Sequence, residues 1–188
     1  MSRILARLVA FHFLVLLSAF AVGWLSRWRG SVTRADDPTY MVHFLLGLFA
    51  VLVTLGVHCL IFIYFLGTGR WVKEVALAYR LPDAPLPRLT RDLKRRTFPL
   101  ALAAMLVAIA TAAAGAAAQR QEWPWGVHAS LAATTLLVNL WAFIIEYRNV
   151  SINAGIIDEV MREVDRIRAA HGLPSNAEAI EREHLENH

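Results

Sequence analysis

The chain has 188 residues, of which 57% are hydrophobic and only 18% are charged. This composition is unusual for a soluble domain and indicates a membrane protein. The net charge of +4 comes without a stretch that pairs basic patches with exposed aromatic residues, so we expect no nucleic-acid partner. The single cysteine excludes an intrachain disulfide.

Four apolar runs are each long enough to cross a bilayer, because about 20 apolar residues in a helix span the hydrocarbon core. The first run could instead be a secretory signal peptide, since Ala19-Phe20-Ala21 resembles a cleavage site. Its length and the histidine at position 12 favour a retained helix. The sequence therefore predicts an all-α fold, an integral membrane four-helix bundle within residues 1–150. The spans are expected at about residues 4–25, 41–66, 98–118 and 126–145.

The third run is dominated by alanine. Its alanines recur every four residues from Ala104 to Ala116, which predicts a small-residue packing face for another helix. Pro99 comes directly after the expected start of this span, where proline is tolerated in the first helical turn.

A basic region separates the second and third spans. The second helix can continue past the membrane, because Trp71, Val72, Val75 and Ala76 extend an apolar stripe, and prolines at positions 82, 85 and 87 then stop it. Residues 70–96 carry eight basic side chains. We expect this basic 70–96 loop to connect the two spans outside the membrane.

The last segment, residues 151–188, is expected to form a soluble cytoplasmic helical tail. Ile157, Val160, Val164 and Ile167 recur at helical spacing, which predicts an amphipathic helix over residues 155–170. Its polar face is mixed and partly acidic, so a protein partner fits its apolar stripe better than anionic lipid does. Ser175 and Glu178 predict a capping box for a short last helix.

The basic residues also predict the topology. Four of the 19 Lys and Arg residues, Arg27, Arg29, Arg34 and Arg120, fall in the two connections on one side of the bundle, and the other fifteen fall on the side of both termini. Positive charge concentrates on the cytoplasmic side of membrane proteins. We therefore expect a multi-pass protein of the bacterial cytoplasmic (inner) membrane with both termini in the cytoplasm.

Four histidines interrupt the apolar spans and form two pairs at matched depth. His43 and His58 are 15 residues apart on the second span, so they lie on nearly one face about 22 Å apart along the helix. His12 of the first span matches the cytoplasmic depth of His58. His128 of the fourth span matches the outer depth of His43. Polar groups at such depths usually face the protein interior.

Small and polar residues continue the faces that carry these histidines. Gly47, Ala50 and Thr54 lie between His43 and His58, where they leave room for a helix or a flat ligand. The fourth span has a similar seam, formed by His128, Ala132, Thr135, Asn139, Ala142 and Glu146.

Two histidines from facing helices at one depth are what a b-type haem with two imidazole ligands requires. This plan resembles the four-helix dihaem b cytochromes that anchor respiratory dehydrogenases and pass electrons to quinone. The resemblance is one of architecture and implies an electron-transfer subunit with one or two b haems and quinone as a partner. Iron ligands would be His12 with His58, which we expect to be the safer pair, and His43 with His128. Gly47 and Thr54 would border the ring.

A cofactor-free interpretation uses the same residues differently. The protein would then be a membrane scaffold or accessory subunit that docks a partner subunit, or a second copy of itself, through the basic 70–96 loop and the C-terminal helix. His43 and His128 would be hydrated near the membrane surface, and one of His12 and His58 would hydrogen-bond Thr54 or Ser18. Asn139 would bond a neighbouring helix, and Glu146 would pair with an arginine. No catalytic motif such as H-E-x-x-H or G-x-S-x-G occurs, so no catalytic residue is predicted.

Overall fold

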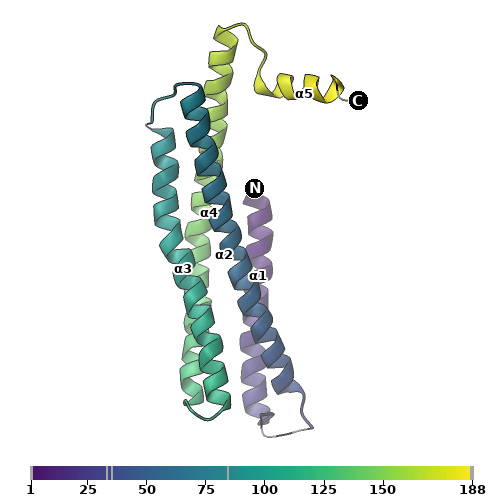
Figure 1. The fold of residues 1–188 in the computed structure, drawn as a ribbon. Helices are drawn as coiled ribbons and strands as arrows, with labels where there is room; N and C mark the ends of the chain where they lie inside the picture. The colour runs from purple at the N-terminus through teal and green to yellow at the C-terminus, as the bar shows by residue number, and fades with distance from the viewer. Residues whose placement is uncertain (1, 33, 35, 84, 187–188) are drawn as a thin grey trace.

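The computed structural model describes residues 2–32, 34, 36–83 and 85–186. Its helices are α1 (Ser2–Arg29), α2 (Thr39–Ala78), α3 (Leu86–Gln119), α4 (Trp125–Ala170) and α5 (Asn176–Glu186). The first four run alternately up and down, and α1 and α3 each pack against both α2 and α4 (Figure 1). The expected all-helical fold is confirmed for the described part of the chain.

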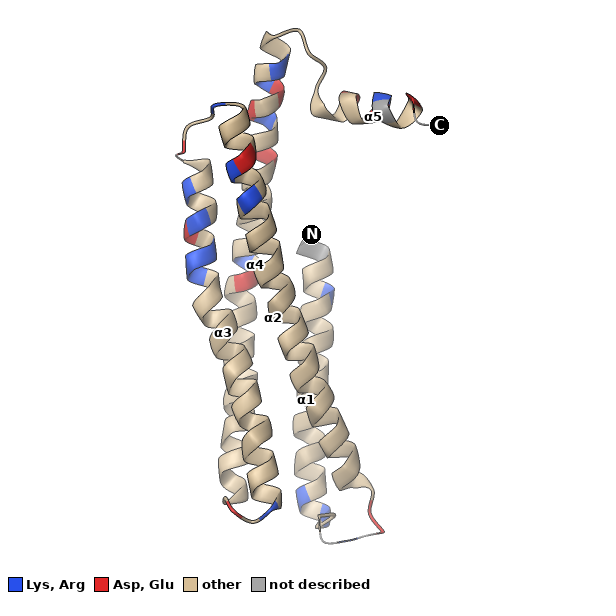
Figure 2. Cartoon of the chain, viewed as in Figure 1, with Lys and Arg blue, Asp and Glu red and all other residues tan. Residues whose placement is uncertain are grey.

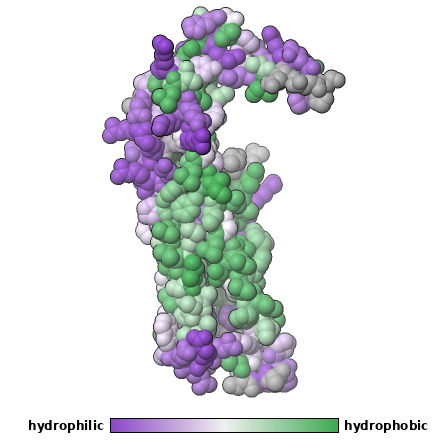
Figure 3. Space-filling view, in the orientation of Figure 1, coloured by the Kyte–Doolittle hydropathy of each residue, from purple (hydrophilic) through white to green (hydrophobic). Residues whose placement is uncertain are grey.

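The four long helices are each long and apolar enough to cross a membrane, as a multi-pass membrane protein requires. Charged side chains gather toward the two ends of the bundle, and an apolar band lies between them (Figures 2 and 3). Large apolar side chains point outward from this band, as they would toward lipid. They include Phe11, Leu14, Leu48, Leu52, Ile63, Leu106, Leu137 and Ile144.

Three of these helices are longer than a membrane span. At about 1.5 Å per residue, α2, α3 and α4 would measure roughly 50–70 Å, against a hydrocarbon core of about 30 Å. Their excess length lies at one end, beyond the start of α1 (Figure 1). We call this part the stalk, made of residues 67–78, 86–97 and 151–170. The opposite end, with residues 30–38 and 120–124, is the loop end.

The stalk corrects two expectations from the sequence. The basic 70–96 segment is mostly helical, because α2 continues to Ala78 and α3 begins at Leu86. Pro85 and Pro87 start α3 instead of preventing it, since proline is well suited to the first helical turn. Pro99 lies inside α3, where it removes one backbone hydrogen bond without ending the helix.

The apolar stripe of the expected tail is largely covered within the chain. α4 runs through residue 150 without a break, so the amphipathic segment is a continuation of the fourth span. Of the predicted stripe, Val160 and Val164 are buried, whereas Ile157 and Ile167 are only partly buried. Val160 packs in one cluster with Val72 of α2 and Leu93 of α3, and Ile157 packs against that cluster. Much of this stripe therefore belongs to a three-helix core.

The packed face of α3 follows a different spacing from the one expected. Ala101, Ala104 and Ala108 are buried, whereas Ala112 and Ala116 are exposed. A step of four residues turns an α-helix by about 400°, so three such steps move a side chain about 120° around the axis. Side chains that stay on the buried face must therefore follow one another at alternating steps of three and four residues. Side chains spaced strictly four residues apart turn gradually out of the interface.

The short last helix begins as the sequence predicts. The backbone N–H of Ser175 donates to Glu178 Oε2 at 2.9 Å, and the backbone N–H of Glu178 donates to Ser175 Oγ at 3.3 Å. This reciprocal pair is a capping box. Asn176 also donates to Asp165 Oδ1 of α4 from its backbone at 2.8 Å and from its side chain at 2.7 Å.

The stalk core supplies a stability prediction. Val160 is 1% exposed, so a carboxylate in its place would be buried without a partner. We expect Val160→Asp to lower the free energy of unfolding by about 3 kcal/mol or more, measured by thermal or denaturant unfolding in detergent. Leu77→Asp is the matched control, because Leu77 lies on α2 of the stalk and is 70% exposed. Equal effects of both substitutions would contradict the packed stalk.

Candidate functional site

The outer histidine pair lies near the loop end, where α2 and α4 face each other. The ring centroids of His43 and His128 are 6.0 Å apart, and the ring planes differ by 67°. His43 Nδ1 bonds the carbonyl of Ala19 on α1 at 3.1 Å, and His128 Nδ1 bonds that of Thr111 on α3 at 2.9 Å. A carbonyl only accepts, so each Nδ1 carries the hydrogen. Each Nε2 then keeps a lone pair, which accepts no hydrogen bond from any described residue.

Each imidazole of this outer pair lies against a glycine of the helix that accepts its hydrogen bond. A Cβ placed on Gly23 of α1 would come within 2.7 Å of His43 Cε1. A Cβ on Gly115 of α3 would come within 2.9 Å of His128 Cε1. Real carbon atoms do not approach so closely, so only glycine allows the rings to lie where they do. Backbone bond and glycine contact together fix the orientation of both rings.

A cavity of about 70 Å³ lies at the centre of the four helices beside the outer pair. All four helices contribute to it, and Gly47, Thr54, Thr111 and Thr135 are among the residues that border it. Gly47 faces open space, since a Cβ there would meet nothing within 4 Å. The sequence-predicted residues His43, His128, Gly47 and Thr54 therefore surround one space.

A second hollow opens on the outside of the bundle between α1 and α4. Its volume is about 310 Å³, and Trp24 and Trp125 line it with small residues of α4. The two indoles make an edge-to-face contact with centroids 5.9 Å apart, and the Arg27 guanidinium lies 4.8 Å from the centre of the Trp125 ring. Phe20 lines both this groove and the central cavity, so its side chain lies between the two spaces.

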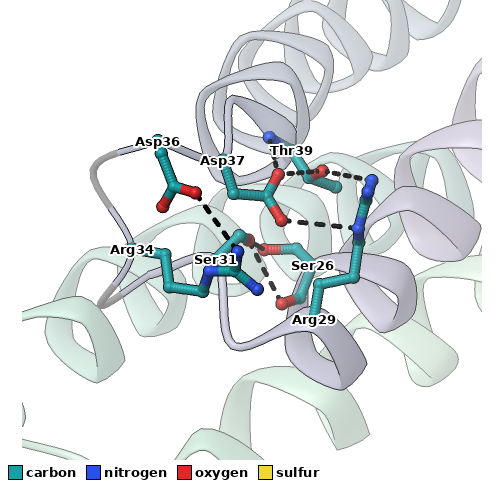
Figure 4. A network of polar contacts seen from close by, with 7 residues as sticks. All are labelled: Ser26, Arg29, Ser31, Arg34, Asp36, Asp37 and Thr39. Carbon is teal, nitrogen blue, oxygen red and sulfur yellow. Dashed lines mark hydrogen bonds and ion pairs between the residues drawn. The ribbon is translucent and has the colours of Figure 1, made fainter.

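A network of polar side chains joins α1 to α2 below the outer pair (Figure 4). Asp37 accepts hydrogen bonds from the backbone and the hydroxyl of Thr39, at the first residue of α2, and lies 3.4 Å from Arg29 Nε. A carboxylate at a helix N-terminus is favoured by the helix dipole. On the α1 side, Ser26 and Ser31 bond through their hydroxyls at 2.6 Å. The network fixes the helix ends from which His43 and Gly23 are placed.

The inner pair forms a hydrogen-bonded cluster. The ring centroids of His12 and His58 are 6.3 Å apart, and Phe143 lies against both rings. His12 Nε2 lies 2.7 Å from the hydroxyl of Thr54, which itself donates to the carbonyl of Ala50 at 2.7 Å. A hydroxyl has one hydrogen to donate, so His12 Nε2 must carry the hydrogen of their bond.

Both ring nitrogens of His58 are hydrogen-bonded. Nε2 lies 3.1 Å from Asn139 Oδ1, and Nδ1 lies 2.8 Å from Glu146 Oε1. The Asn139 amide donates to the carbonyl of Thr135 at 2.9 Å, which leaves its oxygen as the acceptor for His58. The sequence predicted the interhelical bond of Asn139. It was wrong about Glu146, which is fully buried beside His58 and makes no ion pair with an arginine in the described chain.

The polar face of α4 continues toward the stalk. The Asn149 amide donates to Thr97 Oγ1 of α3 at 2.9 Å. The Asn153 amide donates to Tyr64 Oη and Thr68 Oγ1 of α2 at 3.2 and 3.0 Å. Sequence reasoning missed these residues, although Asn149 and Asn153 extend the spacing of the Asn139–Glu146 seam. It also missed Gly23 and Gly115, whose role depends on contacts between helices.

Comparisons with protein families, with curated proteins and with solved structures found no match to this chain. Among the described residues, no group of three or more His, Cys, Asp or Glu side chains is arranged to hold a metal ion. A pair of imidazoles on an iron already held by a macrocycle needs only two protein ligands, and the outer pair supplies two.

The loop network supplies a pH prediction. Hydrogen bonds from Thr39, with the charges of Arg29 and Arg34, hold the pKa of Asp37 below its usual value. A lowered native pKa stabilises the fold fully above the unfolded value of about 4, and this contribution disappears as the pH falls toward the native pKa. We expect Asp37→Asn to lower the melting temperature at neutral pH, and the difference from wild type to vanish in acid. Asp36→Asn is the control, and an equal loss from both variants would contradict the assignment.

Proposed function

We propose that this protein is a membrane electron-transfer protein of the b-type cytochrome kind, with one haem held by His43 and His128. The observation that carries the proposal is the state of the two imidazoles. Each is oriented by an Nδ1–H bond to a backbone carbonyl, which is how proteins fix imidazole ligands for a metal, and each keeps Nε2 free. Bound haem iron supplies the chemistry of one-electron transfer.

The spacing of the pair suits two imidazoles on one iron. Two metal–nitrogen bonds of about 2 Å each, with the distance from each nitrogen to its ring centre, add up to roughly 6 Å. The observed centroid separation is 6.0 Å. The donor set supports a bis-histidine haem, and the separation of the rings agrees with it.

The space beside the outer histidine pair has two parts, the central cavity and the α1–α4 groove. A ligand of this size needs a pocket of at least about 300 Å³. The central cavity of about 70 Å³ is too small alone, and the α1–α4 groove adds about 310 Å³ beyond the Phe20 side chain. We propose that Phe20 moves aside when the ring binds. Gly47, Ala50, Ala108 and Ala132 contribute little side-chain bulk to the cavity wall.

The inner pair is outside this proposal, which departs from the sequence expectation that it is the safer one. Ligation of iron requires a free imidazole lone pair, and His58 has both ring nitrogens engaged by Glu146 and Asn139. Ligation there would break one of these buried bonds. We assign one haem to the protein and a different role to the inner cluster.

The membrane location, the topology and the partners of the protein belong to the same proposal. The arginine distribution favours the bacterial cytoplasmic membrane with the stalk and both termini in the cytoplasm. The electron partner would be a quinone in the membrane or a partner subunit. The basic surface of α3 in the stalk, with Arg88, Lys94, Arg95 and Arg96, is a place for an acidic partner subunit, since much of the apolar stripe of α4 is already covered.

Ligand substitution tests the proposal. We expect the purified wild-type protein to show the reduced-minus-oxidised absorption spectrum of a low-spin b haem, with one haem per chain. His43→Gln and His128→Gln should each lower the haem content at least tenfold, because each removes one iron ligand. His171→Gln, outside the spans, is the control. Wild-type protein expressed with ample haem that carries none would refute the proposal and favour the cofactor-free scaffold.

The glycine contacts provide a test that leaves the ligands in place. A methyl group on Gly23 or Gly115 would displace the adjacent imidazole, so Gly23→Ala and Gly115→Ala should each reduce haem content severalfold or shift the haem spectrum. Gly56→Ala is the matched control, because a Cβ on this α2 glycine meets nothing within 4 Å. Spectra that respond to Gly56→Ala as strongly as to the other two would contradict the assigned ring positions.

A further inference from the structure

Three titratable side chains meet inside the bundle away from the proposed haem ligands. His12 of α1, His58 of α2 and Glu146 of α4 are each 0% exposed. They lie in the part of α1, α2 and α4 that we treat as membrane-embedded, near its stalk-side boundary. Burying such groups is costly unless they are hydrogen-bonded or have a function. The haem proposal uses none of them.

The hydrogen bonds fix where most of the protons of this cluster lie. His12 Nε2–H donates to Thr54, because the Thr54 hydroxyl hydrogen is engaged by the carbonyl of Ala50. His58 Nε2–H donates to Asn139 Oδ1, because an amide oxygen only accepts. One further proton must lie between His58 Nδ1 and Glu146 Oε1, since two lone pairs at 2.8 Å would repel. The His58–Glu146 pair is therefore neutral overall, whichever partner holds this proton.

Two acceptor atoms of the cluster remain without partners. His12 Nδ1 and Glu146 Oε2 are buried, and neither has a hydrogen-bond partner in the described chain. A buried acceptor left unpaired destabilises the folded protein. The cluster thus has two vacant positions for hydrogen and no spare hydrogen to fill them.

Toward the stalk, α4 continues the cluster with polar side chains, beside buried apolar ones such as Phe65 and Val150. The amide of Asn153 lies about 10 Å further along α4 than Glu146, at about 1.5 Å per residue, on the same face. Its Oδ1 is also buried and unpartnered, and its amide nitrogen bonds Tyr64 and Thr68. Asn149 lies between Asn153 and Glu146. Polar side chains of α4 therefore extend from the cluster toward the stalk, whose outer part is rich in charged residues (Figure 2).

Neighbouring charges do not neutralise the cluster. The nearest basic residues along α1 and α4 are Arg7 and Arg148, which are exposed and form no ion pair with a described residue. The facing part of α3, from Thr97 to Met105, has no titratable side chain. On α2, the next charged residue toward the stalk is Arg70, twelve residues after His58. His12, His58 and Glu146 must therefore balance their charge among themselves.

We propose that His12, His58 and Glu146 form a proton-binding site inside the membrane, filled from water at the stalk end through the Asn149–Asn153 side. The site takes up one proton from the aqueous phase, and its total charge changes from 0 to +1. The vacant lone pair of His12 Nδ1 or of Glu146 forms the new bond to hydrogen. The site is independent of haem, so it stands or fails separately from the proposed electron transfer.

Infrared difference spectroscopy of the full-length protein in lipid nanodiscs tests this site. Between about pH 4 and pH 9, across the usual pKa of histidine, we expect a buried carboxylic-acid carbonyl band to change reversibly in wild type. Glu146→Gln should remove the band, and His12→Gln should shift the midpoint of its titration by at least one pH unit. Glu181→Gln on the exposed side of α5 is the control. The carbonyl band does not involve iron, so the result does not depend on haem content.

A second measurement needs no variant that could fail to fold. Nitrogen NMR of wild-type protein labelled at histidine should show a buried ring whose nitrogen shifts move toward a protonated form over the same range. Exposed His171 serves as the reference ring. A carbonyl band and buried histidine signals that stay constant across the range would overturn the proposal. So would a titrating band that survives in folded Glu146→Gln protein.

Discussion

The structure depends on the buried face of α4, because this face changes character where the helix leaves the apolar band. Within the band most of its buried residues are polar or small, from Thr135 through Asn139 and Glu146 to Asn149, and Phe143 and Val150 are the apolar exceptions. In the stalk the same face continues with Ile156, Val160 and Val164. In a bilayer, lipid would provide no hydrophobic drive for helix association, so hydrogen bonds and close packing would hold the spans together. A stalk in water would regain that drive through the burial of apolar side chains.

This constraint also separates the two histidine pairs. All four imidazoles need partners at their depth, and hydrogen bonds from them tie α1 to α2, α2 to α4 and α3 to α4. The outer rings bond only backbone carbonyls and keep one nitrogen free, beside a cavity. The inner rings bond side chains, and both ring nitrogens of His58 are hydrogen-bonded. The same bundle can therefore hold the proposed haem ligands and the buried titratable cluster. The two groups lie about four helical turns apart.

The sequence predicted four long apolar helices, the proximity of His12 to His58 and of His43 to His128, and the capping box of α5. These features depend on local composition and helical spacing. The sequence was wrong about residues 86–96 of the 70–96 loop, because Pro85 and Pro87 lie at the start of α3 instead of ending a helix. It was wrong about Glu146 because pairing across the bundle depends on how helices rotate. Gly23 and Gly115 could not be predicted, since their importance comes from rings on other helices.

Electron paramagnetic resonance of the oxidised, purified protein tests the central claim most directly. Two imidazoles bound to one iron give a low-spin ferric signal, and planes that differ by 67°, as those of His43 and His128 do, make that signal strongly anisotropic. The account predicts this signal at one spin per chain, together with its loss in His43→Gln and His128→Gln. A high-spin signal, or a low-spin signal that disappears in His58→Gln and survives in His43→Gln, would contradict it.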